Sequence, residues 1–162
     1  MSTATANSAS TTANQTSAPE RPGPEARQLE VFIGKWKVAG HNHTAQGPDV
    51  PVHGEETYEW LPGGFFVCGR WAHYFGEGGH EGLSVLGFDQ DRRELFVHNV
   101  DNLGFARIYP LTVRDRTWTY DGTRERATQE FTRDGKSFAI HWEKRQGSIW
   151  TPLCDLKATR VR

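Results

Sequence analysis

The chain has few cysteines, one methionine and no excess of charge of either sign. Its 162 residues include two Cys, 19 Lys and Arg, and 20 Asp and Glu, for a formal net charge of -1. Two cysteines are too few for a disulfide scaffold. The balanced charge, with no basic run, argues against partners such as nucleic acid or an anionic membrane surface. No apolar stretch approaches the roughly 20 residues that span a bilayer, so no membrane anchor is expected.

Aromatic residues are absent from the first part of the chain. All 19 of them follow residue 31, whereas residues 1–24 contain mainly Ser, Thr, Ala, Asn and Pro. This shift in composition predicts a disordered tail over residues 1–24 and one folded domain over residues 25–162. The tail lacks the basic and apolar regions of a secretory signal, so a cytoplasmic protein is expected.

Turn residues such as Asp-Gly and Gly-Gly recur along the domain at the spacing of antiparallel hairpins. The segments between them are rich in aromatic and β-branched residues, and one short helix is expected from Pro24 to Gly34. Because no helical layer is available to cover an open sheet, we predict an all-β fold, an antiparallel up-and-down β-barrel of about ten strands. A β-sandwich is the alternative. The predicted strands are 35–40, 52–61, 65–75, 83–88, 95–100, 105–113, 117–120, 127–132, 138–143 and 149–161.

The third predicted strand, residues 65–75, is apolar on both faces. An apolar outer face needs a cover, which is either the N-terminal helix or a second subunit, so a homodimer is one expected assembly. Cys68 on this strand and Cys154 near the end of the chain are expected to be buried thiols. A disulfide across neighbouring strands is the alternative for these two residues.

The opening of the domain resembles the calycin superfamily, which includes lipocalins, fatty-acid-binding proteins and nitrobindins. A short helix is followed by the Gly-x-Trp motif of Gly34 and Trp36, and the similarity in architecture extends from Leu29 to Arg162. The segments 59–64, 86–89 and 101–104 resemble more closely an uncharacterised bacterial family of calycin-like barrels, which has no established activity. The resemblance implies a barrel that binds a hydrophobic or aromatic small molecule.

A cofactor is considered because nitrobindins bind haem. They open with Gly-x-Trp-x-Gly-x-Gly and take a haem-ligating His from late in the chain. Here Val38 replaces the middle Gly, and the last histidine, His141, precedes the final predicted strand. We therefore expect no cofactor, with haem as the alternative that the resemblance implies.

A metal site is considered at His41 and His43, with His53 and Glu55 downstream. Histidines at i and i+2 point to one face of a strand, and imidazole is a preferred ligand of zinc and iron. Glycine and proline residues surround the pair, which favours a solvated loop. No metal is therefore expected.

One polar cluster is centred on His98, with Asp101 beyond it and Arg107 and Tyr109 across the turn 102–104. If that turn closes a hairpin, these side chains meet across paired strands. The histidine would then exchange a proton and the arginine would stabilise a developing oxyanion. An ordinary surface cluster is the alternative.

A second histidine, His73, shares a strand face with Trp71. A polar group inside an aromatic barrel would orient a ligand. We therefore predict a small-molecule binding protein. The alternatives are a cofactor-free isomerase or cyclase that uses His98 or His73 as general acid and base, and a dimeric interaction domain with a filled core. The candidate ligand-binding residues are Trp60, Trp71, His73, His98, Arg107, Tyr109, Trp118 and Trp142.

Overall fold

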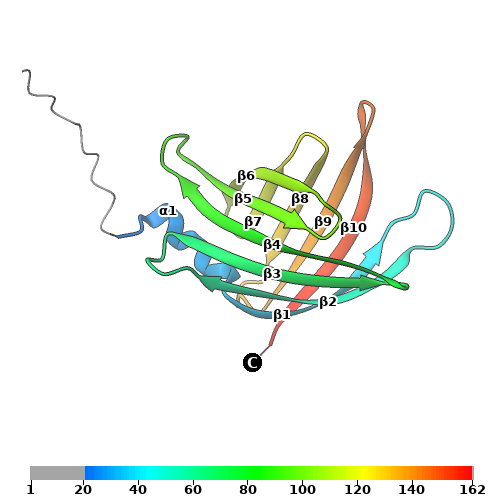
Figure 1. The fold of residues 1–162 in the computed structure, drawn as a ribbon, viewed down its shortest axis with the longest axis horizontal. Helices are drawn as coiled ribbons and strands as arrows, with labels where there is room; N and C mark the ends of the chain where they lie inside the picture. Colours follow the sequence, from blue (N-terminus) through cyan, green and yellow to red (C-terminus); the bar gives the residue numbers. More distant parts are fainter. Residues whose placement is uncertain (1–20, 162) are drawn as a thin grey trace, which may run out of the picture.

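Ten antiparallel strands form a closed barrel in the structure, a computed structural model that describes residues 21–161 (Figure 1). Each strand pairs with its neighbours in sequence, and β1 pairs with β10 to close the barrel. The prediction of an up-and-down barrel is confirmed and the sandwich is excluded. Most of the predicted disordered tail lies outside the described residues. The strands are β1 (Gly34–Asn42), β2 (Val50–Trp60), β3 (Phe66–Phe75), β4 (Gly78–Asp89), β5 (Glu94–Asp101), β6 (Ala106–Arg114), β7 (Thr117–Asp121), β8 (Glu125–Phe131), β9 (Ser137–Gln146) and β10 (Ile149–Arg160).

Strand β4 is longer than the sequence predicts. The glycine-rich stretch 76–79 predicts a turn with a strand only from Leu83, whereas the turn occupies two residues and β4 begins at Gly78. Gly82 within this strand pairs with Trp71 of β3. A Cβ atom at position 82 would lie 2.3 Å from Cζ2 of Trp71. Gly82 therefore makes room for an indole ring within a strand. The tendency of glycine to form turns does not reveal this role.

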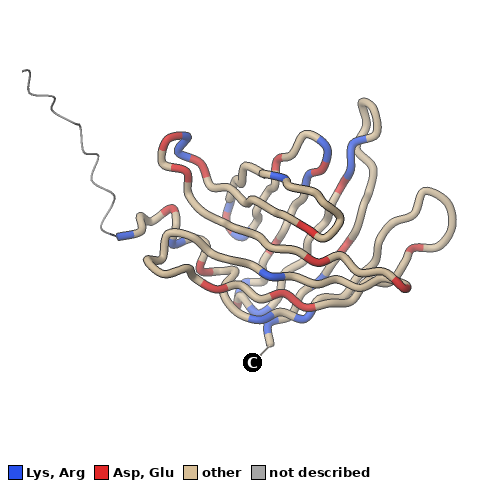
Figure 2. The backbone as a smooth tube through the Cα atoms, in the orientation of Figure 1, with Lys and Arg blue, Asp and Glu red and all other residues tan. Residues whose placement is uncertain are grey.

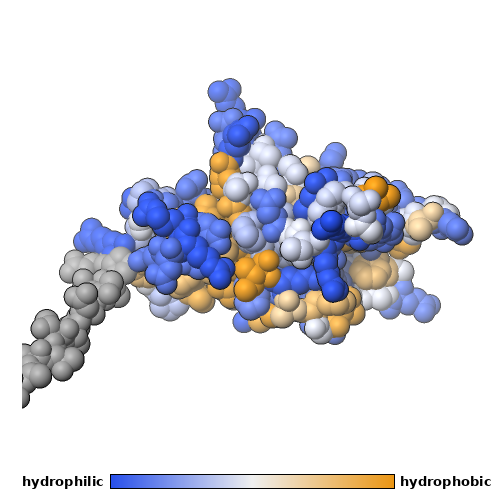
Figure 3. All heavy atoms as spheres, turned by 90° about the horizontal axis from the view of Figure 1, so that it is seen from above, coloured by the Kyte–Doolittle hydropathy of each residue, from blue (hydrophilic) through white to orange (hydrophobic). Residues whose placement is uncertain are grey.

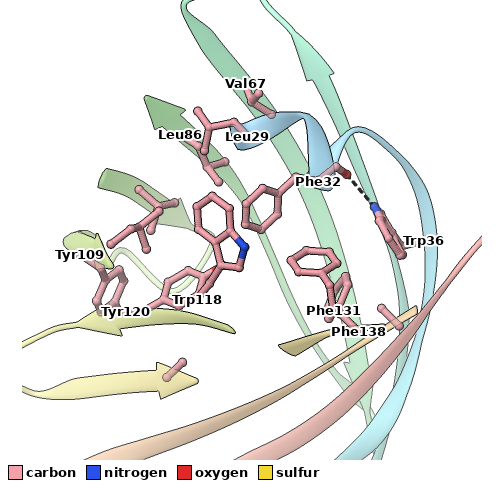
Figure 4. Packing of buried hydrophobic residues seen from close by; sticks show 14 of the residues in the cluster. Leu29, Phe32, Trp36, Val67, Leu86, Tyr109, Trp118, Tyr120, Phe131 and Phe138 are labelled. Atoms are coloured by element: carbon pink, nitrogen blue, oxygen red, sulfur yellow. Dashed lines mark hydrogen bonds between the residues drawn. The ribbon is translucent and has the colours of Figure 1, made fainter. Parts of the chain in front are cut away.

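The N-terminal helical segment enters one end of the barrel (Figure 4). Helix α1 (Pro24–Arg27) begins with a proline, which suits the first helical turn, and the 3₁₀ helix η1 (Gln28–Phe32) follows directly. The side chains of Leu29 and Phe32 are fully buried. These residues pack inside the barrel end, whereas the start of α1 lies beside Phe66. The helix therefore reaches the outer face of β3 only at that end and does not cover the rest of it.

Aromatic rings surround Phe32 and fill this end of the barrel. The ring of Phe32 meets those of Trp118 and Phe131 edge-on, with centroids 4.8 and 5.3 Å apart. Its carbonyl accepts a hydrogen bond of 2.8 Å from Nε1 of Trp36. Edge-to-face contacts of this kind add to the stabilisation that burial provides. We call this group the aromatic plug; it consists of Phe32, Trp36, Trp118, Phe131 and Phe138.

The outer surface carries charges of both signs, interspersed along the strands (Figure 2). Hydrophobic residues show at several places among polar ones (Figure 3). On strands β3 to β6, Phe66, Leu83, Val100 and Ile108 are exposed. The homodimer stays a prediction for this surface. Among residues 21–161, no helix is long and apolar enough to cross a membrane.

The two cysteines lie on strands that are not neighbours. Cys68 is on β3 and Cys154 is on β10; both are half-buried and free, so they do not form the alternative disulfide. Burial, aided by the nearby carboxylates of Asp155 and Glu125, raises the pKa of the Cys154 thiol to about 12. This thiol therefore stays protonated and unreactive at neutral pH.

Candidate functional site

The barrel is hollow beyond the aromatic plug. A cavity of about 460 Å³ lies between the inner faces of the strands, a volume typical of small-molecule sites. It extends to the barrel end opposite the helical segment, where Leu103 and Phe105 of the β5–β6 turn line it. The alternative of a filled core is therefore wrong.

Five of the eight predicted ligand-binding residues line this cavity. They come from strands β3, β6 and β9 and bring two indole rings, an imidazole, a guanidinium and a phenol to one space. Gly69 leaves room for the ring of Tyr58, another lining residue, because a Cβ atom at position 69 would lie 2.4 Å from that ring. The five residues are Trp71, His73, Arg107, Tyr109 and Trp142.

Two predicted tryptophans lie away from the cavity, nearer the helical segment. Trp118 belongs to the aromatic plug, where it is buried against Phe32. Trp60 donates a hydrogen bond of 2.6 Å from Nε1 to the carboxylate of Glu30. Both residues have the inward alternation of their strands, but alternation does not tell how deep along the barrel a residue lies.

His98 is the third predicted site residue that does not line the cavity. It lies on β5 between Val97 and Asn99, which both line the cavity. Successive side chains of a strand point to opposite faces, so His98 points outward. It pairs with Ile108 in the register, while Arg107 pairs with Asn99. The predicted cluster of His98 with Arg107 and Tyr109 is therefore wrong.

A buried carboxylate at Glu56 is the centre of one polar group in the cavity. Glu56 is 8% exposed and lies 2.9 Å from Nε2 of His73. The hydroxyl of Tyr58 donates to the same carboxylate at 3.1 Å. Burial, followed by the charge of Glu56, raises the pKa of Tyr58 well above its ordinary value. The phenol therefore remains a hydrogen-bond donor at neutral pH.

A second polar group contains an ion pair. Nη1 of Arg107 donates to Glu125 at 2.6 Å, and the Tyr109 hydroxyl donates to the same carboxylate at 3.1 Å. The guanidinium also lies over the ring of Phe105, 4.1 Å from its centroid. Burial is the main cause that raises the pKa of Tyr109 above its ordinary value. This group is half-buried and fixes a cation at the cavity wall.

A third polar group continues around the cavity. Nε1 of Trp71 donates to Ser84 at 3.1 Å, and the Ser84 hydroxyl donates to Oδ1 of Asn99 at 2.7 Å. The indole of Trp71 also packs against the ring of His80, with centroids 4.7 Å apart, and contributes to the cavity lining. The group therefore presents an aromatic surface held in place by side-chain hydrogen bonds.

Asp101 supplies another carboxylate, close to the open end. It accepts hydrogen bonds of 3.0 Å from the backbone N–H groups of Leu103 and Phe105, and its Oδ2 lies 3.1 Å from Nε2 of His80. Burial acts to raise the pKa of Asp101, but these hydrogen bonds outweigh it and hold the pKa below the ordinary value. Asp101 is therefore ionised at neutral pH.

The cavity has an acidic lining. Among the described residues that line it, the carboxylates are Glu56, Asp101 and Glu125, whereas the only lysine or arginine is Arg107. The three carboxylates therefore outnumber the one guanidinium of the described lining. This interior disfavours an anionic ligand, because the guanidinium of Arg107 already pairs with the carboxylate of Glu125 and no second cation of this kind is in the described lining.

Several lining residues were not predicted from the sequence. The most important is Glu56, which shares the inward alternation of Tyr58 on the same strand. The spacing of two residues between Glu56 and Tyr58 was the sequence signal from which the inward position of Glu56 could have been predicted. Tyr120 also lines the cavity, and its hydroxyl donates to Gln129 at 2.5 Å. The burial of Gln129 could not have been predicted from its residue type, because glutamine side chains are mostly exposed.

A separate cluster with metal-ligating atoms lies at the barrel rim. One ligand atom each from His41, His43 and Asp155 lies within 4.8 Å of the others. The residues predicted as companions, His53 and Glu55, are not part of this set. His43 also contributes to the cavity lining.

Known proteins share this fold at low sequence identity. The structure is similar to Rv2717c from M. tuberculosis, with a TM-score of 0.63, 13% identity, and coverage of 87% of this chain and 99% of that chain. It is also similar to the S-type phycobiliprotein lyase CPES from Guillardia theta, with a TM-score of 0.57, 12% identity, and coverage of 84% and 92%. A de novo designed fluorescence-activating β-barrel matches with a TM-score of 0.45, 12% identity, and coverage of 82% and 96%.

Sequence comparison identifies a family but no characterised relative. No curated protein matches the chain. One family, described as a protein of unknown function (DUF1579), matches residues 21–150. This match covers most of the described barrel, from the helical segment into β10. The chain therefore belongs to the DUF1579 family.

Proposed function

We propose that this protein is a calycin-type carrier or receptor that binds a small molecule inside its barrel. The ligand has an aromatic or apolar body and polar groups that are neutral or cationic. The observation that carries this proposal is the cavity of about 460 Å³, in which indole and phenyl surfaces alternate with fixed polar groups. Sites of this composition use the apolar area for affinity and the few polar atoms for orientation.

The charge of the lining argues against a fatty acid or another carboxylate ligand. A carboxylate in the cavity would face Glu56, Asp101 and Glu125. Arg107 is the one fixed cation of the described lining, and it already pairs with Glu125 at 2.6 Å. An anion would have to break that pair while remaining partly desolvated, which is costly.

A neutral or cationic ligand has suitable partners. Glu56 is buried and pairs with His73, and no lysine or arginine of residues 21–161 forms an ion pair with it. It can therefore accept a hydrogen bond from an amine or amide group of a ligand. The indoles of Trp71 and Trp142 line the cavity and provide apolar surface for an aromatic body. One of the proteins with a similar fold is a phycobiliprotein lyase, but at 12% identity the likeness extends to the fold alone.

Two dyes with the same aromatic body test the preference for charge. N-phenyl-1-naphthylamine is neutral, and 1-anilinonaphthalene-8-sulfonate adds a sulfonate to it. We expect the neutral dye to bind at least tenfold more tightly, which corresponds to about 1.4 kcal/mol. Glu56→Gln should narrow this difference by removing one negative charge. Equal affinities, or tighter binding of the sulfonate, would contradict the proposed ligand class.

A matched pair of variants locates the binding. Ser84 is buried in the cavity wall, whereas Ser148 is exposed in the turn between β9 and β10. Ser84→Phe should reduce the affinity for the neutral dye at least tenfold, because the new ring occupies part of the cavity. Ser148→Phe introduces the same ring on the surface and should leave the affinity unchanged. Circular dichroism checks that both variants fold.

An enzyme is a second candidate function, because His73 is oriented by a carboxylate. Its Nε2 lies 2.9 Å from Glu56 inside the cavity, and a histidine fixed in this way is suited to proton transfer. His98 does not fit this role, since it points away from the cavity. The base-catalysed ring opening of 5-nitrobenzisoxazole tests the candidate. It is supported if wild type accelerates the reaction and His73→Gln loses that acceleration, and it is refuted if the two rates are equal.

A further inference from the structure

Histidine and aspartate side chains gather on the outer rim of the barrel, on segments that are far apart in sequence. In the strand register, His41 of β1 is opposite Asp155 of β10, and Asp155 is opposite His141 of β9. Their neighbours Leu156 and Ile140 line the cavity, so the row of three points outward. The rim cluster therefore results from the pairing of three adjacent strands.

His43 brings a third imidazole to the same carboxylate. Although β1 ends at Asn42, the backbone N–H of His43 still donates to the carbonyl of Leu153 at 2.9 Å. The ring of His43 is thereby held beside β10, and its Nε2 lies 2.7 Å from Oδ2 of Asp155. The expectation that this histidine pair lies in a solvated loop is wrong for His41, which belongs to β1. His43 does begin the β1–β2 loop, but its backbone hydrogen bond holds it against β10.

A second aspartate, Asp49 of the β1–β2 loop, completes the cluster. Its Oδ2 lies 3.2 Å from Nδ1 of His43 and 3.5 Å from Nε2 of His41. Within residues 21–161, no lysine or arginine forms an ion pair with Asp49 or Asp155. The two aspartates therefore place two carboxylates at the rim with no fixed cation beside them, and a divalent cation would supply the opposite charge.

From this geometry, we propose that His41, His43 and Asp155 bind a divalent transition-metal ion of the zinc class. Zinc prefers imidazole nitrogen and carboxylate oxygen at about 2.0 to 2.2 Å, in a tetrahedral arrangement. Ligand atoms placed in this way are about 3.4 Å from one another. The three atoms here lie within 4.8 Å of one another. Because their side chains are partly exposed, small rotations bring them to that spacing.

The neighbouring side chains fit the second layer of such a site. Nδ1 of His141 lies 2.5 Å from Oδ1 of Asp155, the oxygen that His43 does not contact. Asp49 approaches the ring of His43 at the nitrogen that faces away from Asp155. A carboxylate that holds a ligating histidine in this way orients the ring and strengthens it as a ligand. His141 and Asp49 are therefore positioning residues.

Three protein ligands leave one tetrahedral position open for water or another molecule. His43 lines the cavity as well as belonging to the cluster. The metal would therefore lie at the cavity rim, while its binding requires no ligand inside the barrel. The metal site and the proposed small-molecule site can be tested independently.

Zinc titration of the full, tag-free chain tests the site. The protein is first stripped with EDTA, and ZnCl₂ is then titrated by isothermal calorimetry. We expect one zinc ion per chain, and we expect His43→Gln and Asp155→Asn each to reduce the affinity at least tenfold. His98→Gln is the matched control, because it removes an outward-facing histidine from a different part of the barrel and should leave the affinity unchanged.

Two further readouts separate a built site from weak surface binding. Co²⁺ bound in a tetrahedral site gives visible absorption bands, which should appear with wild type and be absent with His43→Gln. Zinc should raise the melting temperature of wild type but not that of His43→Gln, since binding to the native state stabilises it. The proposal is overturned if wild type binds no zinc, or if both ligand variants bind zinc as wild type does.

Discussion

The aromatic plug is expected to provide a large part of the stability of the barrel, and Phe32 is its centre. Its side chain is 1% exposed and contacts the rings of Trp118 and Phe131. Truncation to alanine removes buried apolar area and leaves a void that strand pairing prevents from closing. Phe-to-Ala substitutions in such cores cost about 3 to 5 kcal/mol. We expect Phe32→Ala to lower the free energy of unfolding by that amount.

Urea denaturation followed by circular dichroism measures this effect. The midpoint should fall while the slope with urea is unchanged, because the two states expose nearly the same surface. Phe66→Ala is the matched control, since Phe66 is 38% exposed on the outer face of β3; it should cost about 1 kcal/mol or less. If Phe32→Ala costs no more than Phe66→Ala, the helical segment does not stabilise the barrel as described.

Three further predictions concern the cavity wall. Arg107→Ala should lower the free energy of unfolding by about 1 to 3 kcal/mol, because it leaves the half-buried Glu125 without its cation; the double variant Arg107→Met with Glu125→Gln should recover most of that loss in urea denaturation. The pKa of Asp101 lies below its ordinary 3.8, so its ionised form stabilises the native state above about pH 4 and this contribution disappears as the pH falls through the lower, native-state pKa. Accordingly, the stability advantage of wild type over Asp101→Asn should shrink between about pH 5 and about pH 2. Gly82→Ala should displace the indole of Trp71, since a Cβ atom would lie 2.3 Å from it, and both the melting temperature and the affinity for the neutral dye should fall.

The fold was predictable because strand alternation and turn spacing are local properties. The order of ten hairpin-linked strands without a covering helix leaves closure as the economical arrangement. Depth inside the barrel is not a local property. Trp71 and Trp118 both alternate inward, yet one lines the cavity and the other joins the plug. The difference depends on the position of the helical segment, which alternation does not report.

The errors at the candidate site have two different causes. His98 and Asp101 are three residues apart, an odd spacing that places them on opposite faces of a strand. The separation of His98 from Asp101 could therefore have been predicted from the sequence. The rim cluster was not available, because it requires His43 and Asp155 to meet although they are 112 residues apart. Only the pairing of β1 with β10 brings them together.

Indole nitrogen NMR with ¹⁵N-labelled tryptophan tests the binding cavity most directly. Each of the six tryptophans gives one indole N–H signal. Saturation with N-phenyl-1-naphthylamine should shift the signals of Trp71 and Trp142, which line the cavity, and leave those of Trp36 and Trp118 in the plug unchanged. If the dye binds while Trp71 and Trp142 stay unchanged, or if only the plug signals move, the ligand does not occupy the proposed cavity.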